Sequence, residues 1–284
     1  MVLNWLYNNP TWLVGTVLIV GPVVLVCCAL RVFHGIFPME TRREHNEYTG
    51  YVVAIIGINY AVLIAFVAVA VWGAYDHATA IASEEAERVG NLYRDAPGLG
   101  PVMGAELRSD LKTYVRTVVE EEWPAMSRDE YPSAGWRPLE HIQDALADYE
   151  PSKTAQAVYM RESLGELNKL YDIRRQRLSA AENGLEPAVW AIVLLGTVLT
   201  IGFTFLFGMP SLRMHMVMTG GVTAAAMLVL VLIIALDWPF RGEVQASPSM
   251  FKRVAENMRM LDAQEKERSG TFTVGAAAAT PTRK

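Results

Sequence analysis

Four stretches of the chain are long, apolar and almost free of charged side chains. They lie at about Thr11–Leu30, Gly50–Tyr75, Pro187–Ser211 and Met214–Leu236. Each has the length, about 20 residues or more, that an α-helix needs to cross the hydrocarbon core of a bilayer. The pattern therefore predicts a polytopic membrane protein with four transmembrane helices and the lipid bilayer as its first partner.

The second stretch, Gly50–Tyr75, has features that an ordinary lipid-facing helix lacks. Small residues recur in it at spacings of three and four, which lets helices approach closely inside lipid. Asn59 and Tyr60 place two polar side chains near its middle. The helical pattern then continues without proline to about Arg94, which predicts one long rod leaving the membrane.

Between the second and third stretches the apolar residues recur at helical spacing in three segments. Their stripes contain Leu107, Leu111, Tyr114 and Val118; then Leu139, Ile142, Leu146 and Tyr149; then Leu164, Leu167, Tyr171 and Leu178. The sequence predicts an all-α fold: four transmembrane helices with an inserted all-helical extramembrane domain. We expect a first transmembrane pair in 1–75, the helical domain in 76–186, a second pair in 187–236, an amphipathic helix in 237–267 and a disordered tail in 268–284.

The net charge of −5 is unevenly distributed along the chain. Residues Asp76 to Glu186 contain 21 acidic and 13 basic side chains, a net charge of −8. Such a region is a poor binder of nucleic acid, but it concentrates cations near a membrane opening. The run Glu120–Glu122 is expected to be a solvated helix end, with a cation-attracting vestibule as the alternative. We find no enzyme motif and no clustered Cys/His pattern, so neither catalysis nor a metal site is expected.

The short connections between the stretches carry Arg31, Arg42, Arg43 and Arg213, whereas residues 1–10 carry no positive charge. By the positive-inside rule these connections lie in the cytoplasm and the helical domain lies on the extracytoplasmic side. The basic excess of the C-terminal helix argues the other way.

Polar groups within or at the ends of the stretches are candidate functional residues, because burying them in lipid without partners is unfavourable. Asn59 and Tyr60 either bond between helices or face a pore. Thr197, Thr200 and Thr204 share one face and form either a second polar pathway or ordinary hydroxyl-to-backbone bonds. Arg213, His215 and Asp237 lie at helix ends, where anchoring competes with gating or pairing between subunits.

Several strings together resemble the bacterial bestrophin-like membrane proteins, a family formerly described as a domain of unknown function. They are FPMETRREHNE, GINYAVLIAFVAVAVW, EEEWP, LTIGFTFLFG, SLRMHMVMT and LDWPFRG, spread over roughly residues 12–262. The resemblance implies a multi-pass protein of the bacterial inner membrane. It also implies a homo-oligomer, a tetramer or a pentamer, whose second transmembrane helices line a central pore.

Mapped onto this chain, the narrow part of that pore would involve Asn59, Tyr60, Leu63 and Phe66. Bestrophins proper conduct anions, and some bacterial relatives are associated with potassium. This chain departs from an anion design because its membrane stretches lack basic residues and its extramembrane region is acidic. We therefore expect a channel for monovalent cations, K⁺ in the first place, that needs no cofactor. The alternatives are a bestrophin-type chloride channel and a non-conducting membrane sensor or scaffold.

Overall fold

The computed structural model describes residues 7, 9–37 and 39–277, and these residues are almost entirely helical, with no strand among them. The elements are α2 (Thr11–Ile36), α3 (Met39–Glu44), α4 (Asn46–Asp95), η1 (Ala96–Leu99), α5 (Pro101–Thr117), the π-helical turn η2 (Val118–Glu122), α6 (Trp123–Ser127), α7 (Trp136–Ala147), α8 (Thr154–Glu182), α9 (Pro187–Thr204), α10 (Leu212–Asp237) and α11 (Ser249–Ala277). The all-α prediction is confirmed.

The chain divides into two compact units, which are described separately. Unit 1 comprises the described residues up to His77 together with Asn183–Gln245, and unit 2 comprises Ala78–Glu182 with the described residues from Ala246 on. The helix α4 begins in unit 1 and ends in unit 2.

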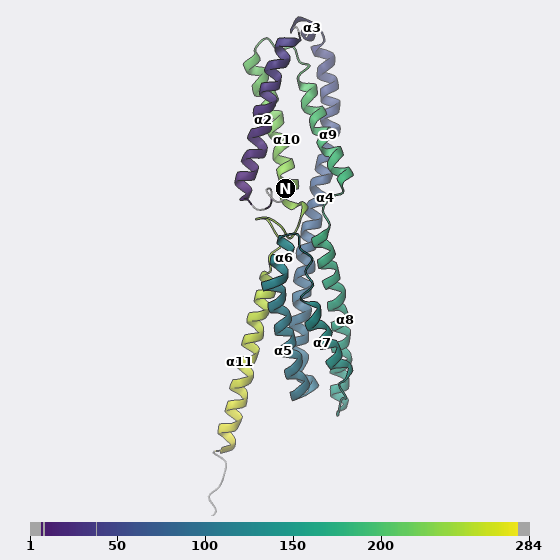
Figure 1. The fold of residues 1–284 in the computed structure, drawn as a ribbon, viewed down its shortest axis with the longest axis vertical. Coiled ribbons are helices and arrows are strands. Elements are labelled where there is room, and N and C mark those ends of the chain that lie inside the picture. The colour runs from purple at the N-terminus through teal and green to yellow at the C-terminus, as the bar shows by residue number, and fades with distance from the viewer. Residues whose placement is uncertain (1–6, 8, 38, 278–284) are drawn as a thin grey trace, which may run out of the picture. The chain divides into compact units, whose positions relative to one another are not determined.

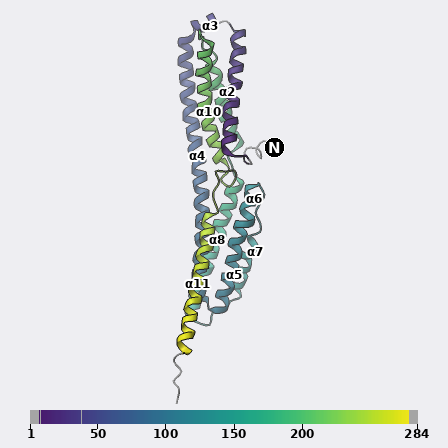
Figure 2. The same ribbon diagram turned by 90° about the vertical axis from the view of Figure 1, so that its left-hand side faces the viewer.

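Unit 1 is a bundle in which α2, the first part of α4, α9 and α10 run side by side with alternating direction (Figures 1 and 2). Its buried core contains Ile64 and Val71 from α4, Val193 from α9, and Ile233 from α10. Within the described residues, four segments contain helices long and apolar enough to cross a membrane: Thr11–Ile36, Asn46–Leu99, Thr154–Thr204 and Leu212–Asp237. Three of the predicted stretches lie within these segments, and the fourth, Pro187–Ser211, overlaps one of them but was predicted to run past its end at Thr204.

The outer surface of unit 1 is apolar. Large hydrophobic side chains on α2, α4, α9 and α10 are exposed, among them Leu25, Val69, Val198 and Val217. In water such a surface would be unfavourable, whereas in lipid it is the expected one.

Unit 2 packs α5, α6, α7 and α8 around the second part of α4, with α11 alongside α5 (Figure 1). Most of the three predicted stripes lies in this core, whereas Tyr149, Leu164 and Tyr171 are only half-buried. Leu107, Leu111, Tyr114, Val118, Leu139, Ile142 and Leu146 are each completely buried. The periodicity of the sequence therefore identified the inner faces of these helices correctly.

The predicted disordered tail from 268 begins too early. Helix α11 continues through Ala277, ten residues past the predicted end of the C-terminal helix at 267, and residues 278–284 lie outside the described residues. The missing hydrophobic stripe suggested disorder, and residues 269–277, which include two glycines, two threonines and a valine, also have low intrinsic helix propensity, so no local signal predicts this extension of the helix.

Candidate functional site

The outward face of α4 in unit 1 is the first candidate site. Asn59 is exposed and Phe66, seven residues later and therefore on the same face, is 73% exposed. The same face carries further exposed apolar residues at spacings of three and four: Val52, Ile55, Val62 and Val69. One amide thus interrupts a continuous apolar stripe.

The amide of Asn59 has a definite orientation. Its Nδ2 donates to the backbone carbonyl of Ile55, one turn earlier, at 2.8 Å. Because that carbonyl can only accept, the nitrogen must face it and the side-chain oxygen points the other way. The side-chain oxygen and the second N–H of the amide are left for contacts outside α4.

Tyr60 and Leu63, the other two residues of the predicted narrow part, lie on the inner side of α4. The Tyr60 hydroxyl is 2.5 Å from Thr197 Oγ1 on α9, and Leu63 packs against the core of unit 1. A Cβ at Gly196 would come within 2.6 Å of the Tyr60 ring, so α9 needs a glycine there. The structure therefore places these two residues in the packing between helices, and separates them from Asn59 and Phe66.

The three threonines of α9 also face the inside of unit 1. Thr197 donates to the carbonyl of Val193 at 2.9 Å, so the hydroxyl of Tyr60 is the donor in their contact. Thr204 donates to the carbonyl of Ile201 at 2.6 Å. Thr200 differs from both, since its buried hydroxyl oxygen makes no hydrogen bond with any described residue.

His215 and Asp237 fasten α9 to α10 near their opposite ends. His215 Nε2 donates to the carbonyl of Thr204 at 2.9 Å. Asp237 accepts from the backbone N–H of Leu185 at 2.6 Å and from Trp190 Nε1 at 3.2 Å. Arg213, the third predicted gating residue, is exposed.

Arg42 is a structural residue that the sequence analysis counted only as a loop charge. Its side chain is buried and donates to the carbonyls of Phe37, Phe205 and Phe207 at 3.2–3.4 Å. Helix ends leave carbonyls without partners, and this guanidinium supplies donors to the end of α9. No local pattern around position 42 reveals this role, because two of the three carbonyls, those of Phe205 and Phe207, lie more than 160 residues away.

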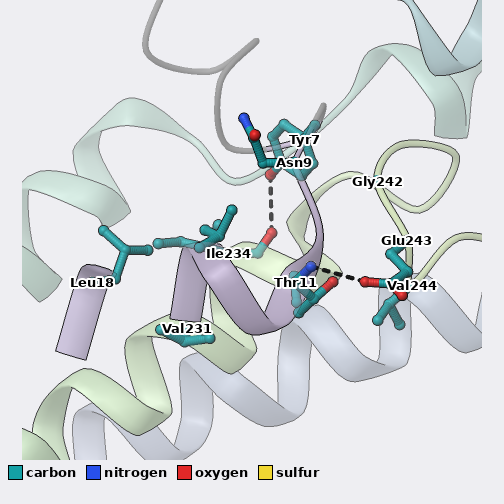
Figure 3. Close-up of a pocket in the computed structure, with 11 residues that line it drawn as sticks. Tyr7, Asn9, Thr11, Leu18, Val231, Ile234, Gly242, Glu243 and Val244 are labelled. Atoms are coloured by element: carbon teal, nitrogen blue, oxygen red, sulfur yellow. Dashed lines mark hydrogen bonds between the residues drawn. The ribbon is translucent and has the colours of Figure 1, made fainter. Parts of the chain in front are cut away.

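At the other end of unit 1 the start of α2 is fastened to the segment after α10 (Figure 3). Tyr7 donates its hydroxyl to the carbonyl of Ile234 at 2.9 Å, and the backbone N–H of Thr11 donates to Glu243 Oε2 at 2.8 Å. A carboxylate at a helix N-terminus is favoured by the helix dipole. The adjoining cavity, with a volume of about 20 Å³, is a packing defect of roughly the size of one water.

Unit 2 contains a cluster of four buried charges, which we call the charge quartet: Glu85, Glu122, Arg174 and Arg177. Arg174 binds both carboxylate oxygens of Glu122, at 2.5 and 2.7 Å. Arg177 binds Glu85 at 2.6 Å and Glu122 at 2.8 Å. The quartet is electrically balanced, which is the condition under which buried charges are tolerated.

Aromatic and polar groups surround the quartet. The Tyr114 hydroxyl donates to Glu85, and the Arg174 guanidinium lies 4.5 Å from the centroid of the Trp136 ring. Arg177 lies 5.4 Å from the Trp123 ring. Cation–π contacts of this kind partly replace the lost hydration of the guanidinium groups.

The expectation that Glu120–Glu122 is a solvated end is wrong for Glu122, which is 1% exposed. The π-helical turn η2 includes this residue and directs its carboxylate inward, toward Arg174 and the backbone N–H of Gly135 at 2.8 Å. The available signal was the pair Arg174 and Arg177 on the same face as the buried Leu170 and Leu178. Burial of Glu122 raises its carboxyl pKa, but the two guanidiniums outweigh this, and the pKa lies below its ordinary value.

The described residues contain no group of three or more His, Cys, Asp or Glu side chains able to hold a metal ion. Each charge of the quartet is paired within unit 2, so the four side chains connect α4, η2 and α8. The role of the quartet in the protomer is therefore to position helices.

Two solved structures share this fold at low sequence identity. A crystal structure described as a substituted membrane protein is 12% identical, with a TM-score of 0.61, over 84% of this chain and 97% of its own. A single-substitution variant of a bacterial bestrophin homologue from Klebsiella pneumoniae is 12% identical, with a TM-score of 0.59, over 83% of this chain and 97% of its own. No curated protein sequence matches this chain.

The Bestrophin-like domain family matches residues 20–251, which include most of the first candidate membrane-spanning helix, the other three in full and the helical region between them. The match covers well over half of the chain and agrees with the fold likeness to the Klebsiella homologue. This chain is accordingly a multi-pass membrane protein that belongs to the bestrophin-like family.

Proposed function

We propose that the protein is a homo-oligomeric cation channel, passing K⁺, whose pore is lined by the outward face of α4. The observation that carries this proposal is the exposed amide of Asn59 within an otherwise apolar transmembrane face. Facing lipid, its oxygen would have no hydrogen-bond partner, which is costly in hydrocarbon. Around a symmetry axis the same oxygen meets water, ions and its copies in neighbouring subunits.

The orientation of the amide supports a cation rather than an anion. Because one N–H of Nδ2 is bonded to the carbonyl of Ile55, the amide oxygen is free to face the axis in the proposed ring of subunits. Oxygen dipoles can replace part of the hydration shell of a cation without a fixed charge. The region Gly50–Tyr75 also contains no charged side chain that would attract an anion.

Phe66 supplies the apolar part of the proposed pore. It lies two turns from Asn59, roughly 10 Å along the helix axis at the ordinary α-helical rise. A ring of phenyl groups narrows a lumen and excludes water, so that it can close by dewetting. Tyr60 and Leu63 stand behind this face, and in this proposal they support α4 instead of contacting the ion.

Purified protein in liposomes with opposing K⁺ and Cl⁻ gradients tests the proposal. We expect a reversal potential that follows K⁺. Asn59→Leu should lower K⁺ conductance roughly tenfold, the effect of about 1.4 kcal/mol lost at the ion path. Val198→Leu, which changes an exposed side chain on α9, is the matched control and should leave the conductance unchanged.

Each other outcome has a definite meaning. A reversal potential that follows Cl⁻ contradicts the cation proposal and favours a bestrophin-type anion channel. The absence of current from protein that is oligomeric and folded favours the sensor or scaffold. If Asn59→Leu and Val198→Leu behave alike, the pore is lined by another face.

The side of the membrane on which unit 2 lies stays a prediction from the arginines of the short connections. A cysteine introduced at the exposed Asp148 tests it through reaction with a membrane-impermeant maleimide in intact cells. Labelling is expected if unit 2 is extracytoplasmic, and protection until the cells are opened places it in the cytoplasm.

A further inference from the structure

The contact between α5 and α11 has two halves: in one the charged side chains form ion pairs, and in the other they do not. The two helices run in opposite directions along one side of unit 2 (Figure 1). Toward the C-terminal part of α11, opposite charges meet: Arg108 pairs with Glu265, and Lys112 pairs with Asp262 at 2.5 Å. This half is an ordinary ladder of ion pairs.

In the other half, three basic side chains have no acidic partner. Arg116 projects from α5, and Lys252 and Arg259 project from α11. All three are exposed, and none forms an ion pair or side-chain hydrogen bond with any described residue. The nearby Glu120 offsets only part of this charge. With Glu256, one helical turn from both Lys252 and Arg259, counted as well, a small positive excess remains here, next to the acidic segment 76–186.

These side chains border a groove of about 500 Å³ between the two helices. Its lining also includes the half-buried Val119 and Ala255 and the exposed hydroxyl-bearing Ser109. The volume lies within the range of pockets that hold small organic ligands. The groove thus combines an apolar floor with a polar rim, which carries two guanidiniums, the ammoniums of Lys112 and Lys252, two hydroxyls and the carboxylate of Glu120.

We propose that this groove, which we call the α5–α11 groove, is a binding site for a small phosphorylated molecule. A guanidinium binds two phosphate oxygens at once, and a lysine adds a point charge. Three cations suit an anion with more than one negative charge, such as a diphosphate, better than a single carboxylate. The described lining contains no aromatic ring for stacking on a base, so recognition is directed to the phosphates.

The experiment uses the full chain in phosphatidylcholine nanodiscs and isothermal titration with sodium pyrophosphate, ATP and adenosine. Pyrophosphate and ATP should bind with similar affinity, adenosine should not bind, and added salt should weaken binding. Arg116→Ala combined with Arg259→Ala should weaken binding about tenfold for each guanidinium removed. Both side chains are exposed, so the variant should keep the unfolding temperature of the parent protein.

Arg175→Ala is the matched control, since it removes an exposed arginine from α8, on the other side of unit 2 from α11. Equal loss in the control and the double variant, unchanged binding in the double variant, or no binding by the parent protein would each overturn the proposal. Nanodiscs that contain phosphatidylglycerol separate two phosphate sources. If they abolish ATP binding, the site exists and its occupant is a lipid headgroup. Binding is measured without ion flux, so this result is independent of whether the protein conducts K⁺.

Discussion

At the scale of single residues, Glu122 is the acidic member of the quartet that binds both of its arginines. It is bound by Arg174, by Arg177 and by the backbone N–H of Gly135, so both of its oxygens are used. A buried pair is a weak source of net stability, but the removal of one partner leaves an uncompensated charge in a low-dielectric interior. Glu122 is therefore the sensitive member of the quartet.

Glu122→Gln should destabilise the protein by about 3–5 kcal/mol, because two buried guanidiniums would then share only Glu85. Thermal unfolding followed by tryptophan fluorescence measures this at pH 7, with Trp123 and Trp136 beside the quartet as reporters. Glu121→Gln is the control, because Glu121 is exposed and belongs to the same turn. A control as unstable as Glu122→Gln would contradict the role of the quartet.

The destabilisation caused by Glu122→Gln depends on pH, and the lowered pKa of Glu122 fixes the sign of that dependence. The pKa of Glu122 is lower in the folded protein than in the unfolded chain, where it is about 4.3. Its contribution to stability is therefore complete above that value and is lost as the pH falls through the folded pKa. The difference in unfolding temperature between parent and Glu122→Gln should shrink below about pH 4.

The burial of apolar residues in unit 2 could be predicted from the sequence, whereas the burial of Glu122 could not. Leu107, Leu111 and Leu139 were predicted to be buried, because hydrophobic periodicity is a local signal. The burial of Glu122 depends on arginines more than 50 residues away and on one extra residue in a helical turn. Neither feature is visible within a window of one helix.

At the scale of elements, the connection between α9 and α10 is fixed by the first residue of α4. Asn46 accepts from the backbone N–H of Gly208 at 2.7 Å and donates to its carbonyl at 3.0 Å. A Cβ at Gly208 would collide with the backbone of Arg42 and Arg43, so the connection between α9 and α10 packs directly against the backbone of α3 at this position. The side-chain amide thus takes the place of a strand-like backbone partner.

Asn46→Ala should cost about 1–3 kcal/mol, the value of two hydrogen bonds. Hydrogen exchange is the sharpest measurement, since the Gly208 amide loses its acceptor and should exchange faster. Glu47→Ala, at the next and exposed position, should leave that amide protected. If the Gly208 amide exchanges at the same rate in Asn46→Ala and the parent protein, the contact does not hold the turn.

The start of α9 could be predicted from the sequence, whereas the contact between Asn46 and Gly208 could not. Pro187 is the first residue of α9 as expected, because proline at a helix start loses no hydrogen bond. The end of α11 was misplaced, since the residues after 267 have neither an apolar stripe nor high helix propensity that would predict a helix there. Boundaries with a local cause were thus read correctly, and contacts between distant segments needed the structure.

At the scale of the whole molecule, the outward face of α4 has to meet copies of itself if the protein forms a ring. Its exposed positions Val52, Ile55, Asn59, Val62, Phe66 and Val69 alternate spacings of three and four. This is the repeat that lets several helices pack side by side about a common axis. The sequence had indicated all four residues of the predicted narrow part, but only the structure separates Asn59 and Phe66 from Tyr60 and Leu63.

Crosslinking tests that arrangement directly. In a background of Cys27→Ser and Cys28→Ser, which removes the native thiols, Phe66→Cys should form disulfide-linked subunits on mild oxidation in the membrane. Val198 on α9 has a similar exposure, but Val198→Cys should give no disulfide-linked subunits, because in the proposed ring this position faces lipid. Crosslinking at Val198 without crosslinking at Phe66 would move the axis to α9, where the unpaired hydroxyl of Thr200 would become the polar group nearest to it.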